Sequence, residues 1–101
     1  MTTNTTIPEL RAHDVNSFGD TVPFMLSSDW KDRMKGEYYQ LVLRIKGLRA
    51  MLAKYHDGKL DFTPNSPINE LEYQLRIMES YRRILELRAD ADKIEFDWRV
   101  L

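Results

Sequence analysis

Apolar residues recur along residues 30–55 with the spacing of one helix face. The steps between them alternate between four and three residues, which is the heptad spacing of a continuous apolar line. The line consists of Met34, Tyr38, Leu41, Ile45, Leu48, Leu52 and Tyr55. Because such a line is stable only when it is covered, the pattern predicts a long helix that packs against a partner helix.

A second stretch supplies this partner with the same spacing. Its apolar line consists of Ile68, Leu71, Leu75, Met78, Leu85 and Ala89. Arg82 fills the gap in this line, which suggests that the seam opens there towards solvent, a ligand or another protomer. The sequence therefore predicts an all-α fold, a long antiparallel two-helix hairpin. Two helices bury little surface, so we expect copies of the chain to form a homo-oligomer.

Helix-start and helix-end signals bound both predicted helices. The first is expected to begin at the Ser-Ser-Asp run 27–29 and to end just before Gly58, which can adopt the left-handed conformation. The second is expected to begin with Ser66 as its cap and Pro67 in its first position, and to end near Lys93.

Two glycines lie inside the first helix, Gly36 and Gly47. A glycine within a helix often marks a place where another segment approaches the backbone. We assign this role to Gly47, with simple tolerance of the glycine as the alternative.

The segments outside the helices divide the chain into a flexible arm (1–21), a hairpin domain (22–95) and a tail (96–101). The arm is rich in Thr, Asn and Asp, and its lone His13 has no ligand pattern around it. The apolar run 22–26 should fold back on the hairpin or on a neighbouring protomer. In the tail region, apolar Ile94, Phe96, Trp98 and Val100 alternate with charged residues. This pattern favours a strand that packs on the hairpin, on 22–26 or on another subunit, and continued helix is the alternative.

Composition narrows the possible functions. The 101 residues carry a formal charge of -1 and contain no cysteine, so no duplex nucleic-acid partner, disulfide or thiolate metal site is expected. No basic leader precedes an apolar run, and no apolar run is long enough for a membrane span, which favours a cytoplasmic protein. Without a paired histidine, a nucleophile beside a base or a glycine-rich phosphate loop, we expect no enzyme, no metal and no cofactor.

Polar residues at the edges of both apolar lines are the candidate ligand-binding groups. Arginine can bind phosphate with two hydrogen bonds, tyrosine can stack on a base, and glutamine can bond to polar edges. The residues are Arg33, Tyr38, Tyr39, Gln40, Arg44, Gln74, Tyr81 and Arg88, the last three interleaved with Ile77, Ile84 and Ala91. Residues 29–59 contain eight Lys or Arg against four Asp or Glu, so the local potential is positive. The alternative is that these groups set register across an oligomer, as at coiled-coil edges.

The chain resembles a family of small helical proteins from crAss-like and other tailed bacteriophages. The most distinctive pieces are Glu37-Tyr38-Tyr39-Gln40-Leu41 and Leu60-Asp61-Phe62-Thr63-Pro64, and the resemblance covers residues 24–95. Gly36 and Ser66 depart from it, where a helix former and cysteine are expected. The architecture is similar to hairpin proteins with which phages sequester cyclic nucleotides of bacterial defence systems.

The resemblance implies a phage anti-defence protein that binds a nucleotide second messenger, a cyclic oligonucleotide or an ADP-ribose derivative, without cleaving it. Such a protein would act in the cytoplasm of the infected host. Two alternative functions stay open. The chain can be a module that binds and inhibits a host protein, or it can be an accessory of the virion or its assembly.

Overall fold

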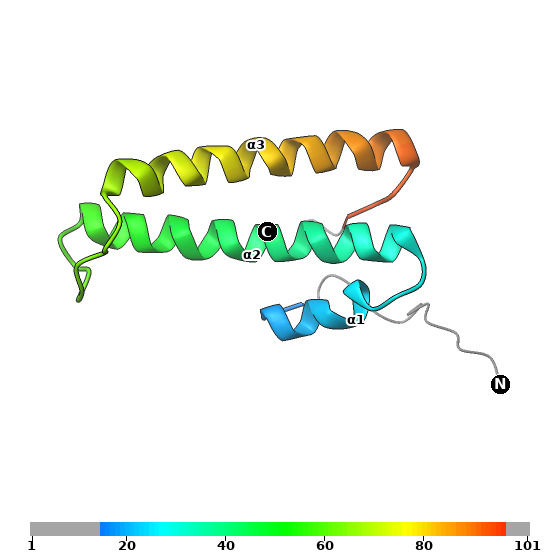
Figure 1. Ribbon diagram of the computed structural model, residues 1–101, viewed down its shortest axis with the longest axis horizontal. Coiled ribbons are helices and arrows are strands. Elements are labelled where there is room, and N and C mark those ends of the chain that lie inside the picture. Colours follow the sequence, from blue (N-terminus) through cyan, green and yellow to red (C-terminus); the bar gives the residue numbers. More distant parts are fainter. Residues whose placement is uncertain (1–14, 97–101) are drawn as a thin grey trace.

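A computed structural model describes residues 15–96, and the secondary structure of this part of the chain is entirely helical (Figure 1). A short 3-10 helix, η2 (Phe18–Thr21), leads into α1 (Val22–Met25). Two long helices follow, α2 (Trp30–His56) and α3 (Ile68–Asp92). The predicted all-α class is confirmed, and residues 15–96 contain no strand. No helix within them is long and apolar enough to cross a membrane.

Helices α2 and α3 lie side by side and run in opposite directions, with η2 and α1 against α2 (Figure 1). Their two apolar lines face each other, and Tyr38, Ile45 and Leu85 at the centre are fully buried. The predicted line of α2 is buried or half-buried along its length, except for Tyr55 at its end, which is 42% exposed.

The ends of α2 follow the predicted signals. The Asp29 carboxylate accepts a hydrogen bond from the Lys31 amide at 3.0 Å, which satisfies one free donor of the first turn. At the other end Gly58 has φ of 70°. This left-handed residue lets the Lys59 amide donate to the Lys54 carbonyl at 2.8 Å, which closes the helix.

The start of α3 differs by one residue from the prediction. Pro67, not Ser66, is the N-cap, since its ψ of 144° is extended and the helix begins at Ile68. At the other end Lys93 is left-handed, with φ of 58°. The Ile94 amide then donates to the Ala89 carbonyl at 2.8 Å.

This turn directs the chain back onto the helices, and both Ile94 and Phe96 are buried. Residues 94–96 therefore pack on the hairpin without forming the predicted strand. Trp98 and Val100 lie outside the described residues, as does His13 at the other end of the chain.

The N-terminal segment packs on α2. Residues 15–21, which the sequence assigns to the flexible arm, include buried Val15 and Thr21. In the apolar run 22–26, Phe24 is buried, whereas Val22 and Leu26 remain exposed. The run does fold back on the helices, and it does so chiefly through one aromatic side chain.

The close approach to a glycine occurs at Gly36 and not at Gly47. A Cβ atom at Gly36 would lie 2.7 Å from Met25 Sδ and 2.9 Å from Phe24 Cβ, whereas a Cβ at Gly47 would meet nothing within 4 Å. Gly36 therefore allows α1 to dock against α2. It is also a position where the sequence departs from the resembled family.

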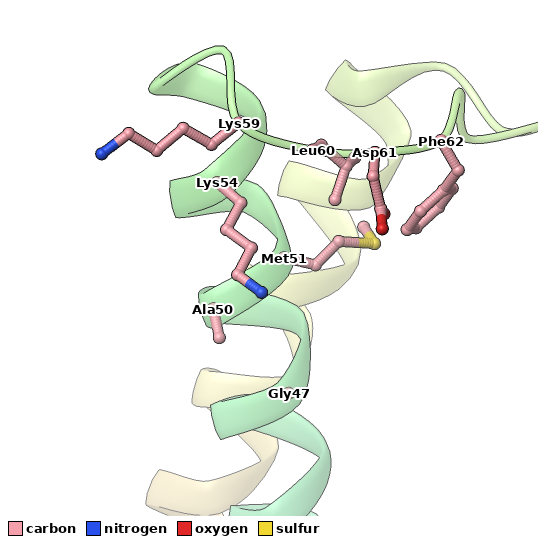
Figure 2. A pocket seen from close by; sticks show the side chains of 8 residues that line it. All are labelled: Gly47, Ala50, Met51, Lys54, Lys59, Leu60, Asp61 and Phe62. Carbon is pink, nitrogen blue, oxygen red and sulfur yellow. The ribbon is translucent and has the colours of Figure 1, made fainter.

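The two ends of the helix pair are covered to different extents by the rest of the described chain. The N-terminal segment and residues 94–96 all cover the end of the helix pair that contains Tyr38 and Leu85. At the other end the connection, residues 57–67, is the only part of residues 15–96 beside α2 and α3, and a small pocket opens there (Figure 2). Leu71, Leu75 and Met78 of α3 are accordingly only half-buried.

We predict opposite effects on stability for alanine at the two helical glycines. Gly47→Ala should raise the free energy of unfolding by about 1 kcal/mol, because alanine favours the helix and nothing obstructs its methyl group. Gly36→Ala should lower it by about 1 kcal/mol, because overpacking against Phe24 exceeds the gain in helix propensity. Urea unfolding followed by circular dichroism measures both. Equal stabilisation of both variants would contradict the docking of α1 on Gly36.

Candidate functional site

The predicted site tyrosines of α2 belong to the hydrophobic core. Tyr38 and Tyr39 are 0% and 2% exposed. The Tyr38 ring stacks on Phe96 with 3.9 Å between ring centroids, and the Tyr39 ring meets Phe24 edge-on at 5.3 Å. In this packing neither ring has a free face on which a base could stack. Instead of lying beside a ligand, as the sequence predicts, the two rings pack segments of the core together.

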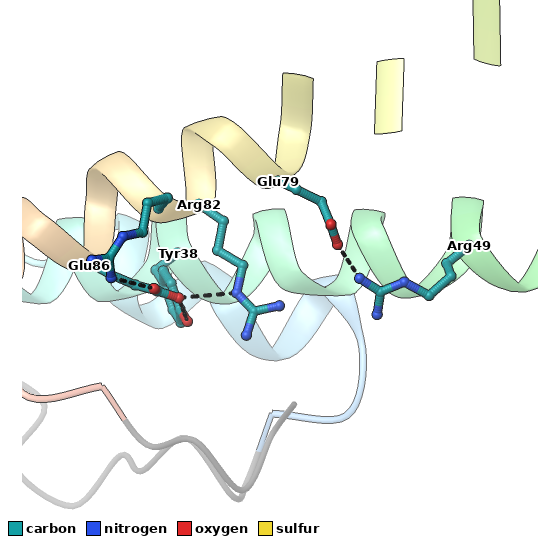
Figure 3. A network of polar contacts seen from close by, with 6 residues as sticks. Tyr38, Arg49, Glu79, Arg82 and Glu86 are labelled. Carbon is teal, nitrogen blue, oxygen red and sulfur yellow. Dashed lines mark hydrogen bonds and ion pairs between the residues drawn. The ribbon is translucent and has the colours of Figure 1, made fainter. Parts of the chain in front are cut away.

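Tyr38 also takes part in a polar network between α2 and α3 (Figure 3). Its hydroxyl donates a hydrogen bond of 2.9 Å to Glu86 Oε2, and Arg82 Nε donates to the same oxygen at 3.1 Å. Burial of the phenol, together with the hydrogen bond to the Glu86 carboxylate, raises the pKa of Tyr38 above its ordinary value. Farther along the helices Arg49 of α2 pairs with Glu79 of α3.

This network corrects the prediction for Arg82. Its side chain is only 23% exposed and is paired with Glu86, so the apolar seam does not open at this position. A carboxylate four residues after an arginine on a helix is the sequence signal that could have indicated this pairing. The role of Glu86 was missed because its hydroxyl partner, Tyr38, is distant in the sequence.

Two further predicted residues of α2 bind the N-terminal segment of their own chain. Arg33 Nη1 donates to the Ser27 carbonyl at 2.9 Å, and Gln40 Nε2 donates to Thr21 Oγ1 at 2.8 Å. The Thr21 hydroxyl is buried, so this bond satisfies a polar group inside the fold.

Arg44 is more open to solvent. Its guanidinium lies 5.3 Å from the centre of the Phe18 ring, a cation–π contact at the surface. The side chain of Arg33 is likewise exposed apart from its one hydrogen bond. Both arginines therefore keep donors available to an anion, although their guanidinium groups contact η2 and the α1–α2 turn.

The predicted residues of α3 have a different environment, because all of them face solvent. They belong to one line along the side of α3 that does not contact α2, which we call the outer face. It consists of Gln74, Ile77, Tyr81, Ile84, Arg88 and Ala91. Ile77, Tyr81 and Ile84 are 51%, 41% and 52% exposed. Within residues 15–96 neither Tyr81 nor Arg88 has a polar partner.

The outer face repeats the heptad spacing of the inner lines, but no helix of residues 15–96 covers it. Alternating steps of three and four residues keep Ile77, Tyr81 and Ile84 on one stripe. If another copy of the chain covered this stripe, the contact would stabilise an assembly. While the stripe is exposed, it is a candidate surface for a partner. The structure thus brings the α3 candidates together and separates them from the α2 candidates.

The predicted site residues line none of the pockets that we describe within residues 15–96. One of these pockets, of about 500 Å³, lies where Phe96 returns to α3 and has Arg83, Glu86 and Asp90 in its wall. Its carboxylates do not favour an anionic ligand. In the described part of the chain no three His, Asp or Glu side chains gather as metal ligands would.

The fold and these side chains define a small all-helical protein whose candidate binding groups lie on an exposed helix face. The family model for Sequestin matches residues 28–91, and the chain belongs to this family. The matched segment contains α2, the connection and almost all of α3. The name of the family refers to sequestration of a partner. No curated protein and no solved structure matches the chain.

The raised pKa of Tyr38 predicts a loss of stability at alkaline pH. Since the phenol ionises near 10.0 in the unfolded chain and only at higher pH in the folded one, its contribution is complete below pH 10 and declines above it. The free energy of unfolding should fall by up to about 1.4 kcal/mol per pH unit there. Tyr38→Phe should reduce this slope, and the exposed-site control Tyr81→Phe should not. Urea unfolding from pH 8 to 11.5 tests this, and equal slopes in all three proteins would contradict it.

Proposed function

We propose that this Sequestin protein binds and sequesters a nucleotide immune second messenger, a cyclic oligonucleotide or an ADP-ribose derivative, without cleaving it. In this role it is a phage anti-defence protein of the host cytoplasm. The observation that carries the proposal is the outer face of α3, on which Tyr81 and Arg88 are exposed within an apolar line. Membership of the Sequestin family supports the sequestering role.

Binding requires more than one copy of the chain. A ligand on a single helix face would touch only one wall, whereas affinity depends on groups that surround and desolvate it. The uncovered heptad line favours pairing of α3 with α3 of another copy. In an antiparallel pair centred on Tyr81, Gln74 of one copy would lie beside Arg88 of the other. Each pair would thus contain two equivalent crevices around a pair of phenol rings.

Each exposed group has a defined task in such a crevice. The Arg88 guanidinium would donate two hydrogen bonds to a phosphate, and partial desolvation at the interface would strengthen them. The Tyr81 ring would stack on a base, and the Gln74 amide would bond to its polar edge. Arg33 and Arg44 would add positive potential from α2. Because no nucleophile or metal takes part, the ligand would leave unchanged.

The same surface supports a second candidate function. A stripe with Ile77 and Ile84 on it can also dock an apolar helix of a host protein, which the chain would then inhibit. Purification of one stoichiometric host protein, with no nucleotide, would favour this function. Presence of the chain in purified virions would favour an assembly accessory.

We predict that the purified protein sediments as a multimer and binds at least one messenger in a calorimetric panel of cyclic di- and trinucleotides and ADP-ribose derivatives. Chromatography after release should recover the ligand intact. Arg88→Gln should weaken binding by roughly 10- to 100-fold, because a charge-assisted hydrogen bond contributes about 1.5–3 kcal/mol.

Arg76→Gln is the matched control for this measurement, since Arg76 is an exposed arginine of the same helix that contacts Tyr73 and lies off the outer-face line. It should bind as the wild type does. A monomeric protein that gives no heat with any ligand of the panel would overturn the proposal.

A further inference from the structure

A pocket of about 310 Å³ lies at the thin end of the helix pair, between α2 and the connection (Figure 2). One helix face of α2 forms one wall, with Gly47, Ala50 and Met51 along it. The side chains of Leu60, Asp61 and Phe62 point from the connection towards this face. We call this cavity the tip pocket. All its lining residues come from one chain.

Small residues on α2 keep the tip pocket open. Gly47 has no side chain, and a Cβ atom built there would meet nothing within 4 Å. Ala50, one turn farther along, adds only a methyl group. The glycine therefore lowers helix propensity at a position where the part of the chain that the structure describes leaves room for a side chain. Within residues 15–96, the only structural effect that we find for the missing side chain at Gly47 is the empty space of the pocket beside it.

The opposite wall presents apolar and aromatic surface. Phe62 is 55% exposed although its ring points towards Met51 of α2, and Leu60 beside it is half-buried. Phe62 also lines an adjoining pocket of about 250 Å³ near Tyr55. A flat ring placed against Phe62 and Met51 would gain aromatic and sulfur–aromatic contacts and cover this surface.

Charged groups surround this apolar surface. The Lys54 side chain lies along α2 towards Ala50, and Lys59 extends outward from the rim (Figure 2). Neither lysine, nor the carboxylate of Asp61, has an ion-pair partner within residues 15–96. Lys54 can bind an anion in the pocket, and Lys59 adds positive potential at its rim. Asp61 can accept a hydrogen bond from an amino or hydroxyl group.

We infer that the tip pocket is a binding site for a small planar anion of the size of a nucleoside monophosphate. Its volume is at the lower end of the range of ligand pockets, about 300–1,000 Å³, so it suits one ring system with one anionic group. The site is separate from the outer face of α3 and needs no second copy. It therefore stands whether or not the proposed function holds.

Titration with adenosine 5′-monophosphate, followed by the amide resonances of the 15N-labelled full chain, tests this inference. The ligand should shift the resonances of residues 47–54 and 59–62. Adenosine and inorganic phosphate, each carrying half of the recognised chemistry, should bind at least ten-fold more weakly. Gly47→Leu should abolish the shifts, because the leucine side chain would occupy the pocket from a position where its Cβ meets nothing within 4 Å.

Ala53→Leu is the matched control, since Ala53 is an exposed residue of α2 that does not line the pocket. It should bind the nucleotide within two-fold of the wild type, and so should Arg88→Gln. Lys54→Gln should weaken binding about ten-fold, the loss of one ionic contact. Absence of shifts at residues 47–62, or unchanged binding by Gly47→Leu, would overturn the inference. If Arg88→Gln lost messenger binding but still bound adenosine 5′-monophosphate at the tip pocket, the result would bear on the proposed function and not on this inference.

Discussion

Tyr38 of α2 contacts both α3 and residues 94–96, which follow α3. The end of the helix pair that the N-terminal segment and residues 94–96 cover is organised around these contacts. Its hydroxyl binds Glu86 of α3, and its ring stacks on Phe96 of the returning tail. In a unit of two helices, each side chain can pack against only one partner helix, so little apolar surface is buried. The third layer, from the tail and the N-terminal segment, closes the core around Tyr38.

Within residues 15–96 the opposite end of the helix pair has no third layer, and the tip pocket reflects this. Beside the connection the small residues Gly47 and Ala50 leave a pocket that no segment of the described chain fills. Along α3 the inner line is covered by α2, while Ile77 and Ile84 on the outer face are not. The surface that the fold leaves uncovered is therefore the surface available for a ligand or a second copy.

Similar edge positions on the two helices serve different purposes. Gln40 and Arg33 of α2 lie where the N-terminal segment folds back, so their donors bind that segment. Tyr81 and Arg88 of α3 lie where no described segment of the chain folds back, and both are exposed. The edge of α2 therefore contributes to cohesion inside the chain, whereas the outer face of α3 keeps its polar groups exposed.

Hydrophobic spacing and cap residues determined the two long helices, their facing lines and their ends to within a residue, because these features depend on neighbours three or four positions apart. Only the tertiary structure decided which glycine has a close neighbour, how the seam accommodates Arg82, and which of the candidate tyrosines are buried. Tyr38 and Tyr81 both lie on regular heptad lines, but Tyr38 is covered by Phe96 and fully buried, whereas Tyr81 remains 41% exposed. That difference arises from where distant segments return, and local spacing carries no information about it.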